Sequence, residues 1–258
     1  MSVPRGFREV GVLLDGKETD IRGLYHIKER TTMVSALDLT RLLGLPIEGL
    51  GDKINIGKSV VKDEEKNPLL GRRIAVSAPH TYNRNQSTII PSYYEGNVMF
   101  DVAKELEHML ISDGAVVFMP RSELKEHITL SQRSARINSF NPDLCIETHT
   151  DASASPSARG MHVIRQIART DEVLPRLILD ELSNNLSIPV RSKAIWTRVL
   201  DNNPRFDWYH FLREVRCEAL IIECGFHTNA DDMEILNSPS FPRLYAKSIR
   251  DAIVRYYS

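Results

Sequence analysis

Four residues in this sequence have the side-chain types and positions of a metal-dependent hydrolase site. His80, His149 and Glu223 each stand at the end of a short apolar stretch, and Glu95 opens the helix predicted after His80. Two imidazoles and one carboxylate are a common ligand set for catalytic zinc, with the fourth position left to water. A carboxylate outside that set can take a proton from the water, because bound zinc lowers the pKa of water towards neutrality.

Each of these residues can also be explained without a metal. Glu95 stands three residues after Ser92, so capping of the backbone N–H of Ser92 at the helix start would by itself explain a glutamate at this position. A single histidine after a strand is commonly an ordinary loop residue. Glu223 is harder to explain, because a carboxylate inside an apolar strand is costly without a partner or a role. Residue types and spacing alone do not decide whether zinc binds.

Other side chains compete for the same roles. His162 lies on a predicted strand and His227 follows Glu223 by four residues, so either can replace one of the ligands. Asp151, two residues after His149, can orient a ligand from outside the ligand set. The sequence contains no H-E-x-x-H, no G-x-S-x-G and no phosphate-binding G-x-x-x-x-G-K-[ST]. A helical zinc-protease motif, a serine hydrolase and a P-loop are therefore excluded.

Strands that alternate with helices must position these residues. The predicted strands are 74–77, 115–119, 144–147, 160–164 and 220–223, and the predicted helices are 94–111, 130–140, 173–186 and 241–257. The capping box Thr129-x-x-Gln132 marks the start of the second helix. This alternation predicts an α/β fold, with a largely parallel mixed sheet covered on both faces in three layers, α/β/α. Ligands gather at the carboxyl ends of such strands, where the candidate residues can converge.

Composition and charge narrow the class of protein. The chain has 258 residues, of which 42% are hydrophobic and 26% charged, which is typical of a soluble globular protein. Its 33 basic and 34 acidic residues give a net charge of −1, which argues against nucleic-acid binding. Apolar runs fall short of the ~18 residues of a membrane span, and the N-terminus lacks a signal peptide's apolar core. The three cysteines stand in apolar runs without a C-x-x-C pair, as buried thiols do.

Four segments, in this order, resemble the zinc-dependent N-acetylmuramoyl-L-alanine amidases of the type called amidase 3. Ile74-Ala-Val-Ser-Ala-Pro-His80 stands where the family has a strand that ends in a Gly-His-Gly-Gly-like loop. Tyr94-Glu95-Gly-Asn resembles the helix start with its ligand glutamate. Cys145-Ile-Glu-Thr-His149-Thr-Asp-Ala152 resembles a Ser-Ile-His-Ala-Asn-Ala segment. Leu220-Ile-Ile-Glu223-Cys-Gly-Phe-His-Thr-Asn229 resembles Val-Glu-x-Gly-Phe-x-x-Asn.

The resemblance covers residues 72–257, about seven-tenths of the chain. It implies that His80, Glu95 and His149 bind Zn2+ and that Glu223 is the general base. It also implies that zinc-activated water cleaves the amide bond between N-acetylmuramic acid and L-alanine in peptidoglycan. Two departures leave the substrate detail open: residues 81–85 replace the glycines after the first histidine, and Asp151 replaces the usual asparagine.

The first 67 residues are predicted as a separate α+β module, and residues 68–258 as the catalytic domain. The module's expected elements are two strands, an intervening Asp15-Gly16 turn and a helix, at residues 10–14, 24–27 and 35–44. It weakly resembles small modules of cell-wall enzymes, including those related to the copper amine oxidase N-terminal domain. Wall binding and dimerisation are both open, whereas copper binding is not expected because His26 is its only histidine.

Two further functions are left open. A zinc peptidase acting on short or stem peptides would use the same site, and a catalytically silent wall-binding protein would keep the fold. Intact Glu223 beside intact ligand candidates argues against the silent version. Without a signal peptide, the protein is expected to be made in the cytoplasm and to act on the wall after release. A holin-released phage or prophage endolysin and a host enzyme freed by lysis both fit, and the oligomeric state is left open.

Overall fold

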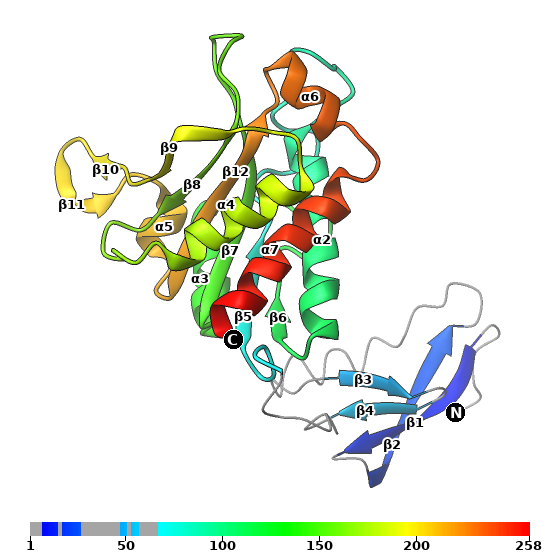
Figure 1. Cartoon of the computed structure of the whole chain (residues 1–258). Coiled ribbons are helices and arrows are strands. Elements are labelled where there is room, and N and C mark those ends of the chain that lie inside the picture. The colour runs from blue at the N-terminus through cyan, green and yellow to red at the C-terminus, as the bar shows by residue number, and fades with distance from the viewer. Residues whose placement is uncertain (1–6, 15–16, 27–46, 51–52, 57–66) are drawn as a thin grey trace. The chain divides into compact units, whose positions relative to one another are not determined.

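The computed structural model describes residues 67–258 and, before them, four β-strands between residues 7 and 56 (Figure 1). Contacts within the chain divide it into two compact units. One comprises residues 1–72 with 110–116, and the other residues 73–109 with 117–258. The predicted division at residue 67 into an accessory module and a catalytic domain stays a prediction.

The described strands of the first 67 residues form one sheet in the order β2-β1-β4-β3. β1 (Phe7–Leu14) pairs antiparallel with β2 (Lys17–His26), as the predicted hairpin requires. β1 also pairs parallel with β4 (Lys53–Ile56), which pairs antiparallel with β3 (Ile47–Leu50). The sequence did not predict β3 and β4, each only four residues long. The predicted helix at 35–44 and the Asp15-Gly16 turn lie outside the described residues.

A six-stranded sheet, in the order β6-β5-β7-β12-β8-β9, supports the candidate residues. β7 pairs parallel with β5 and β12, and β8 pairs parallel with β9, while β12 and β8 are antiparallel. The prediction of a largely parallel mixed sheet is therefore confirmed. The strands are β5 (Arg73–Ser77), β6 (Val116–Phe118), β7 (Leu144–Asp151), β8 (Met161–Arg165), β9 (Val190–Trp196) and β12 (Glu218–Phe226).

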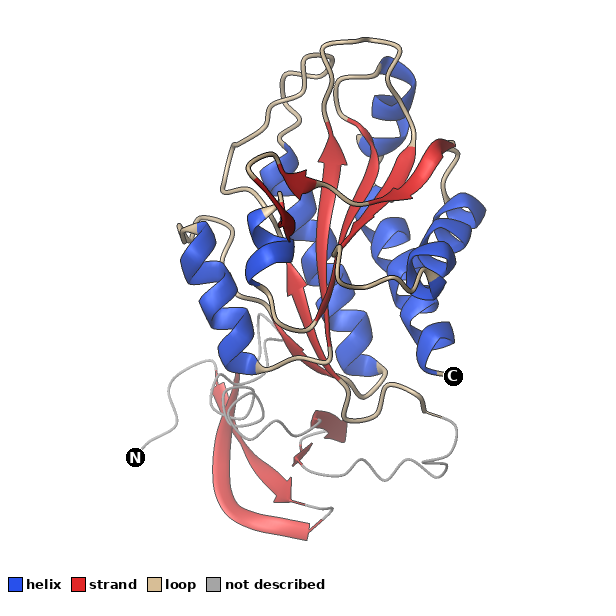
Figure 2. Ribbon diagram, turned by 90° about the vertical axis from the view of Figure 1, so that its left-hand side faces the viewer, coloured by secondary structure: helices blue, strands red, loops and turns tan. Residues whose placement is uncertain are grey.

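Helices lie on both sides of this sheet, as the three-layer prediction states (Figure 2). The longer ones are α2 (Glu95–Ser112), α3 (Leu130–Phe140), α4 (Val173–Asn185) and α7 (Phe241–Tyr257). α4 and α7 pack against one another. On one face of the sheet, α3 and the short α5 (His210–Glu214) bury Ile137, Phe211 and Leu212 in a cluster with residues of the central strands. This is the face to which His149 and Glu223 belong, because alternate residues of a strand share a face.

The start of α3 follows from its sequence. The Thr129 hydroxyl accepts a hydrogen bond from the backbone N–H of Gln132 at 3.1 Å, and the side-chain Oε1 of Gln132 accepts one from the backbone N–H of Thr129 at 2.9 Å. Both halves of the predicted capping box are present, which satisfies two N–H groups at the helix start. Asn141 ends the helix in the left-handed conformation at φ 51°. Within the described residues, we find no helix long and apolar enough to cross a bilayer.

Several elements differ from the sequence predictions. β7 continues to Asp151 and β12 to Phe226, so His149 lies within its strand instead of after it, and Glu223 lies inside its strand instead of at its end. Polar residues at 147–151 hid the end of β7, because they resemble a loop. The elements that the sequence analysis missed are short or exposed: β9, β10 (Val199–Leu200), β11 (Asn203–Asp207), α5 and α6 (Ala230–Leu236).

Candidate metal centre and active site

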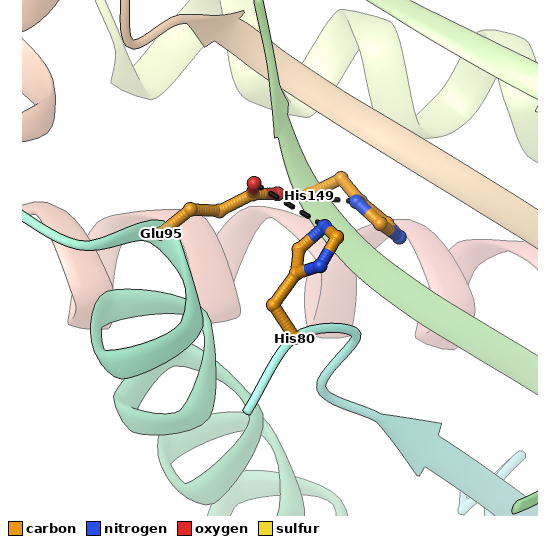
Figure 3. Close-up of side chains that lie close together, drawn as sticks. All are labelled: His80, Glu95 and His149. Atoms are coloured by element: carbon orange, nitrogen blue, oxygen red, sulfur yellow. Dashed lines mark hydrogen bonds and ion pairs between the residues drawn. The ribbon is translucent and has the colours of Figure 1, made fainter. Parts of the chain in front are cut away.

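The structure brings together the three residues expected to bind a metal. His80 comes from the loop after β5, Glu95 is the first residue of α2, and His149 lies on β7 (Figure 3). One ligand atom from each lies within 4.8 Å of the others. Nε2 of His80 is 3.4 Å from one oxygen of Glu95, and Nδ1 of His149 is 3.1 Å from the other. Two imidazole nitrogens and a carboxylate oxygen in such a group suit Zn2+.

Glu95 is buried and points into this group. Its carboxylate accepts hydrogen bonds from the Thr150 N–H at 3.0 Å and from the Asn85 amide at 2.8 Å. These hydrogen bonds come from residues other than Ser92, so capping at Ser92 does not account for the position of the Glu95 carboxylate. Burial raises the pKa of Glu95, but the hydrogen bonds from His149 and Asn85, together with the electrostatic effect of the nearby imidazoles, outweigh it and hold the pKa at about 2. Glu95 is therefore ionised, as a ligand must be.

The loop that carries His80 is fixed by two arginines and by a glycine. Arg133 donates a hydrogen bond to the Pro79 carbonyl and Arg121 donates one to the His80 carbonyl, both at 2.7 Å. A Cβ atom on Gly96 would lie 2.1 Å from the carbonyl oxygen of Thr81, so only glycine lets the loop approach the start of α2 this closely. Burial lowers the pKa of His80, which favours the neutral imidazole that binds metals.

Negative charge surrounds His149. Burial lowers the pKa of its imidazole, but Glu223, Glu147 and Glu95 together raise that pKa well above its usual value. A site whose carboxylates hold a proton on a buried imidazole is also one that attracts a metal cation in the proton's place. The electrostatics and the donor set therefore both fit a divalent metal ion.

Glu223 lies beside the three candidate ligands. It is the register partner of His149 on the neighbouring strand β12. Burial raises its pKa to about 8; among nearby charges His149 lowers the pKa, whereas Glu95, Asp151 and Glu147 raise it. Its Oε2 atom is buried without a hydrogen-bond partner among the described residues. Buried polar atoms normally have a partner, so this oxygen is available to a substrate, a water molecule or a proton.

The competing histidines have other surroundings. His162 is buried on β8 near the rings of Trp196 and Phe226, and its Nε2 lies 3.6 Å from Asp151. His227 is buried and its Nδ1 lies 3.1 Å from the Thr150 hydroxyl. Neither belongs to the group of possible metal ligands. Asp151 stays near the site, next to His162.

The candidate residues line a pocket of about 530 Å³. Its lining includes the polar side chains of His80, Glu95, His149 and Glu223, and the exposed side chains of Leu130 and Trp208, which we call its apolar rim. The sequence analysis did not single out Trp208, because β11 and α5, between which it lies, were not predicted. Pockets of this size, with a few polar groups among apolar ones, commonly bind small molecules or parts of larger substrates.

The sequence analysis also missed Glu147, which lies two residues before His149 on β7. It is 2% exposed, and its carboxylate faces Arg133, Ser77 and His149. Burial raises the pKa of Glu147, but Arg133 and the other partners hold it below the usual value. The period of two along a strand was the signal that could have found it, because residues 147 and 149 share one face.

The chain is similar to several cell-wall amidases. It is 27% identical over 194 residues to a probable cell wall amidase, LytH, of Staphylococcus epidermidis, which covers 74% of this chain and 60% of the relative. It is 24% identical over 200 residues to N-acetylmuramoyl-L-alanine amidase LytC of Bacillus subtilis, covering 76% of this chain and 38% of LytC. This chain thus spans less than two-thirds of the length of each of these curated relatives.

Solved structures share the fold. Cwp6 from Clostridium difficile aligns with a TM-score of 0.64 at 24% identity, over 70% of this chain and 28% of Cwp6. The catalytic domain of CwlV, an N-acetylmuramoyl-L-alanine amidase from Bacillus (Paenibacillus) polymyxa, aligns with a TM-score of 0.61 at 19% identity, over 72% of this chain and 97% of that domain. Residues 74–255 match the family described as N-acetylmuramoyl-L-alanine amidase. Because that match spans most of its length, the chain belongs to the N-acetylmuramoyl-L-alanine amidase family.

Proposed function

We propose that this protein is a Zn2+-dependent peptidoglycan hydrolase that cleaves the amide bond between N-acetylmuramic acid and L-alanine. The observation that carries the proposal is the convergence of His80, Glu95 and His149 beside Glu223 in one pocket. Membership of the amidase family supports the choice of substrate. When bound, the metal would lower the pKa of a water molecule and polarise the substrate carbonyl.

Metal binding, proton transfer and substrate contact are assigned to different residues of the chain. Nε2 of His80, the carboxylate of Glu95 and Nδ1 of His149 would hold the metal. Glu223 is the general base: its unpartnered Oε2 takes a proton from the attacking water and returns it to the departing alanine nitrogen. The apolar rim at Leu130 and Trp208 contacts the substrate next to the scissile bond and limits the access of other water molecules.

The two other functions differ from this one in their products. A zinc peptidase would use the same residues on an amide bond within the stem peptide. A catalytically silent wall-binding protein would need neither an ionised Glu95 nor a buried Glu223 oxygen without a partner. The presence of both features argues against that function. We further propose that residues 1–67 bind the wall or mediate dimerisation, and that the protein reaches peptidoglycan after a holin or cell lysis releases it.

Digestion of purified peptidoglycan tests the proposal. Zinc-loaded protein, chelated protein and the zinc-loaded Glu223→Gln variant are incubated with the wall, and soluble products are identified by mass spectrometry. We expect only the zinc-loaded wild type to release sugar-free stem peptides that begin at L-alanine. Fragments cut within the stem would instead identify a peptidase. Absence of any cleavage by a protein with stoichiometric zinc would contradict the enzymatic function and favour the wall-binding protein.

A further inference from the structure

Glu147 is a buried carboxylate to which the proposed reaction assigns no role. Its side chain is 3% exposed and lies on the same face of β7 as His149. Burying a carboxylate is costly unless it is paired and hydrogen-bonded. The contacts of its two oxygens indicate what it does.

The two carboxylate oxygens have separate partners. Oε1 accepts a hydrogen bond from the Ser77 hydroxyl at 3.0 Å and lies 2.9 Å from Nη1 of Arg133. The same guanidinium nitrogen donates to the Pro79 carbonyl, which fixes the arginine in place. Oε2 faces Nε2 of His149 at 3.2 Å. Because a carboxylate only accepts hydrogen bonds, Nε2 of His149 must carry the proton in this contact.

The other nitrogen of the same ring then faces the metal site. Nδ1 of His149 points to Glu95 at 3.1 Å, within the group of three possible ligands. Because Nδ1 also faces a carboxylate, it too donates in this contact; a metal would take the place of the Nδ1 proton, while Glu147 keeps the proton on Nε2. Carboxylates that accept the second N–H of a ligand histidine fix its tautomer and orientation in many metal sites.

We propose that Glu147 is a positioning residue of the metal centre, which accepts the Nε2–H of His149 and thereby presents Nδ1 of that ring to the metal. This inference rests on the proposed metal site, though not on the identity of the amide that is cleaved. Ser77 and Arg133 hold Glu147 by its other oxygen. The positioning therefore extends from β5 and α3, through Glu147, to the ligand on β7.

A glutamine at position 147 separates this role from simple packing. It has nearly the shape of glutamate, but Arg133 and Ser77 are donors and will orient its amide oxygen towards themselves. Its NH2 group then faces Nε2 of His149 and cannot accept the proton. The variant Glu147→Gln therefore preserves the packing at position 147 but disfavours the His149 tautomer that carries its proton on Nε2.

The experiment measures the zinc dissociation constant by competition with a chromophoric chelator, for wild type, Glu147→Gln and a control, Glu107→Gln. Glu107 is also a buried carboxylate with a cationic partner, Lys104, but it lies towards the C-terminal end of α2, away from the site. We expect Glu147→Gln to weaken zinc binding by roughly 10- to 100-fold, the usual effect of losing such a partner. The control is expected to change it by less than about twofold.

A second measurement needs no variant that could fail to fold. Nitrogen NMR of zinc-loaded, ¹⁵N-histidine-labelled wild type shows which nitrogen of His149 carries the proton, with the signals assigned from a His149→Ala spectrum. We expect the proton on Nε2 and the metal on Nδ1. Coordination through Nε2, or an unchanged zinc affinity in Glu147→Gln, would overturn the inference. Zinc binding without release of stem peptides would contradict only the proposed function, and leave the role of Glu147 intact.

Discussion

His149 and Glu223 are register partners on the neighbouring parallel strands β7 and β12. The distance between a proposed metal ligand and the proposed base is thus set by backbone hydrogen bonds of the sheet and not by a loop. Both strands lie at the centre of the six-stranded sheet, with two further strands on either side. Catalytic groups on such rigid elements hold their geometry better than groups on loops. The His80 loop contributes the remaining imidazole and depends on the contacts of Arg121, Arg133 and Gly96.

Replacement of Glu223 by glutamine is expected to abolish turnover without releasing the metal. Glutamine preserves the shape of the side chain but cannot take a proton, and general acid–base groups commonly contribute 10²- to 10⁴-fold to the rate. The measurement is the rate of stem-peptide release together with the zinc content of the purified variant. A Glu223→Gln protein with near-normal activity would show that another group is the base.

Zinc removal is expected to lower the stability of the protein. The three proposed ligands come from a loop, a helix start and a strand, so the site exists only when these elements are folded together. A ligand that binds only the folded state stabilises it, by about 2.7 kcal/mol at a free concentration one hundred times its Kd. Thermal unfolding of chelated and zinc-loaded protein measures the difference. The variant His80→Ala should show a much smaller difference, and equal stabilisation of both proteins would exclude His80 as a ligand.

Replacement of Gly96 by alanine is expected to displace the His80 loop. The added Cβ would meet the backbone carbonyl of Thr81 at 2.1 Å, and backbone cannot rotate away as a side chain can. We therefore expect zinc affinity to fall, together with a loss of about 1–3 kcal/mol in the free energy of unfolding. Gly71→Ala is the control: it has open space around its Cβ position, but its φ of 73° disfavours alanine. It should cost stability and leave zinc affinity unchanged.

Replacement of Arg133 by methionine is expected to destabilise the fold strongly. Arg133 and Glu147 are a buried ion pair, with side chains 7% and 3% exposed. Loss of one partner leaves a buried charge, which typically costs 3–5 kcal/mol. The comparison is Lys247→Met, which removes a more exposed helical pair with Asp251 and is expected to cost less than about 1 kcal/mol. Urea unfolding measures both, and similar values for the two variants would contradict the prediction.

His162 is expected to make the protein less stable at acidic pH. Burial, with the nearby Arg191, lowers the pKa of His162 to about 4, whereas the unfolded chain has the usual value of 6.5. Between these values the unfolded state binds more protons than the folded state. Stability is therefore complete above pH 6.5 and is lost as the pH falls towards 4, by up to roughly 3 kcal/mol.

The variant His162→Gln cannot titrate at this position and isolates the contribution. The free energy of unfolding is measured at pH 7 and pH 4.5 for wild type, His162→Gln and the exposed-histidine control His127→Gln. We expect the fall between the two pH values to be about 2–3 kcal/mol smaller in His162→Gln than in the other two proteins. An identical fall in all three would show that His162 is not the responsible group.

Periodicity and capping predicted the elements whose signal is local. α3 begins and ends at the predicted residues because its capping box and its apolar spacing agree. The alternation of apolar strands and helices was sufficient for the fold class. By contrast, β9 was missed because it is an edge strand with several exposed residues and little apolar periodicity. α5, with five residues, is too short for helical periodicity to register.

The part of the candidate site that lies at strand ends and helix starts was predictable from the sequence. These positions identified His80, Glu95, His149 and Glu223, which the fold places in one pocket. The contacts of Glu147 depend on Arg133 and Ser77, which are distant in sequence and meet it only through the packing of α3 and β5. Such an arrangement has no local sequence pattern. The side-by-side position of β7 and β12 is likewise a property of the sheet order.

The central position of β7 and β12 in the sheet also determines which parts of the candidate site can unfold locally. Amide protons of the strands that carry His149 and Glu223 should exchange with deuterium only when the whole sheet unfolds, because each strand has hydrogen-bonded neighbours on both sides. The loop of His80 is held instead by side-chain hydrogen bonds from Arg121 and Arg133, which can break without unfolding the sheet. We therefore expect fluctuations at the proposed metal site to involve the loop of His80, while His149 and Glu223 stay in place.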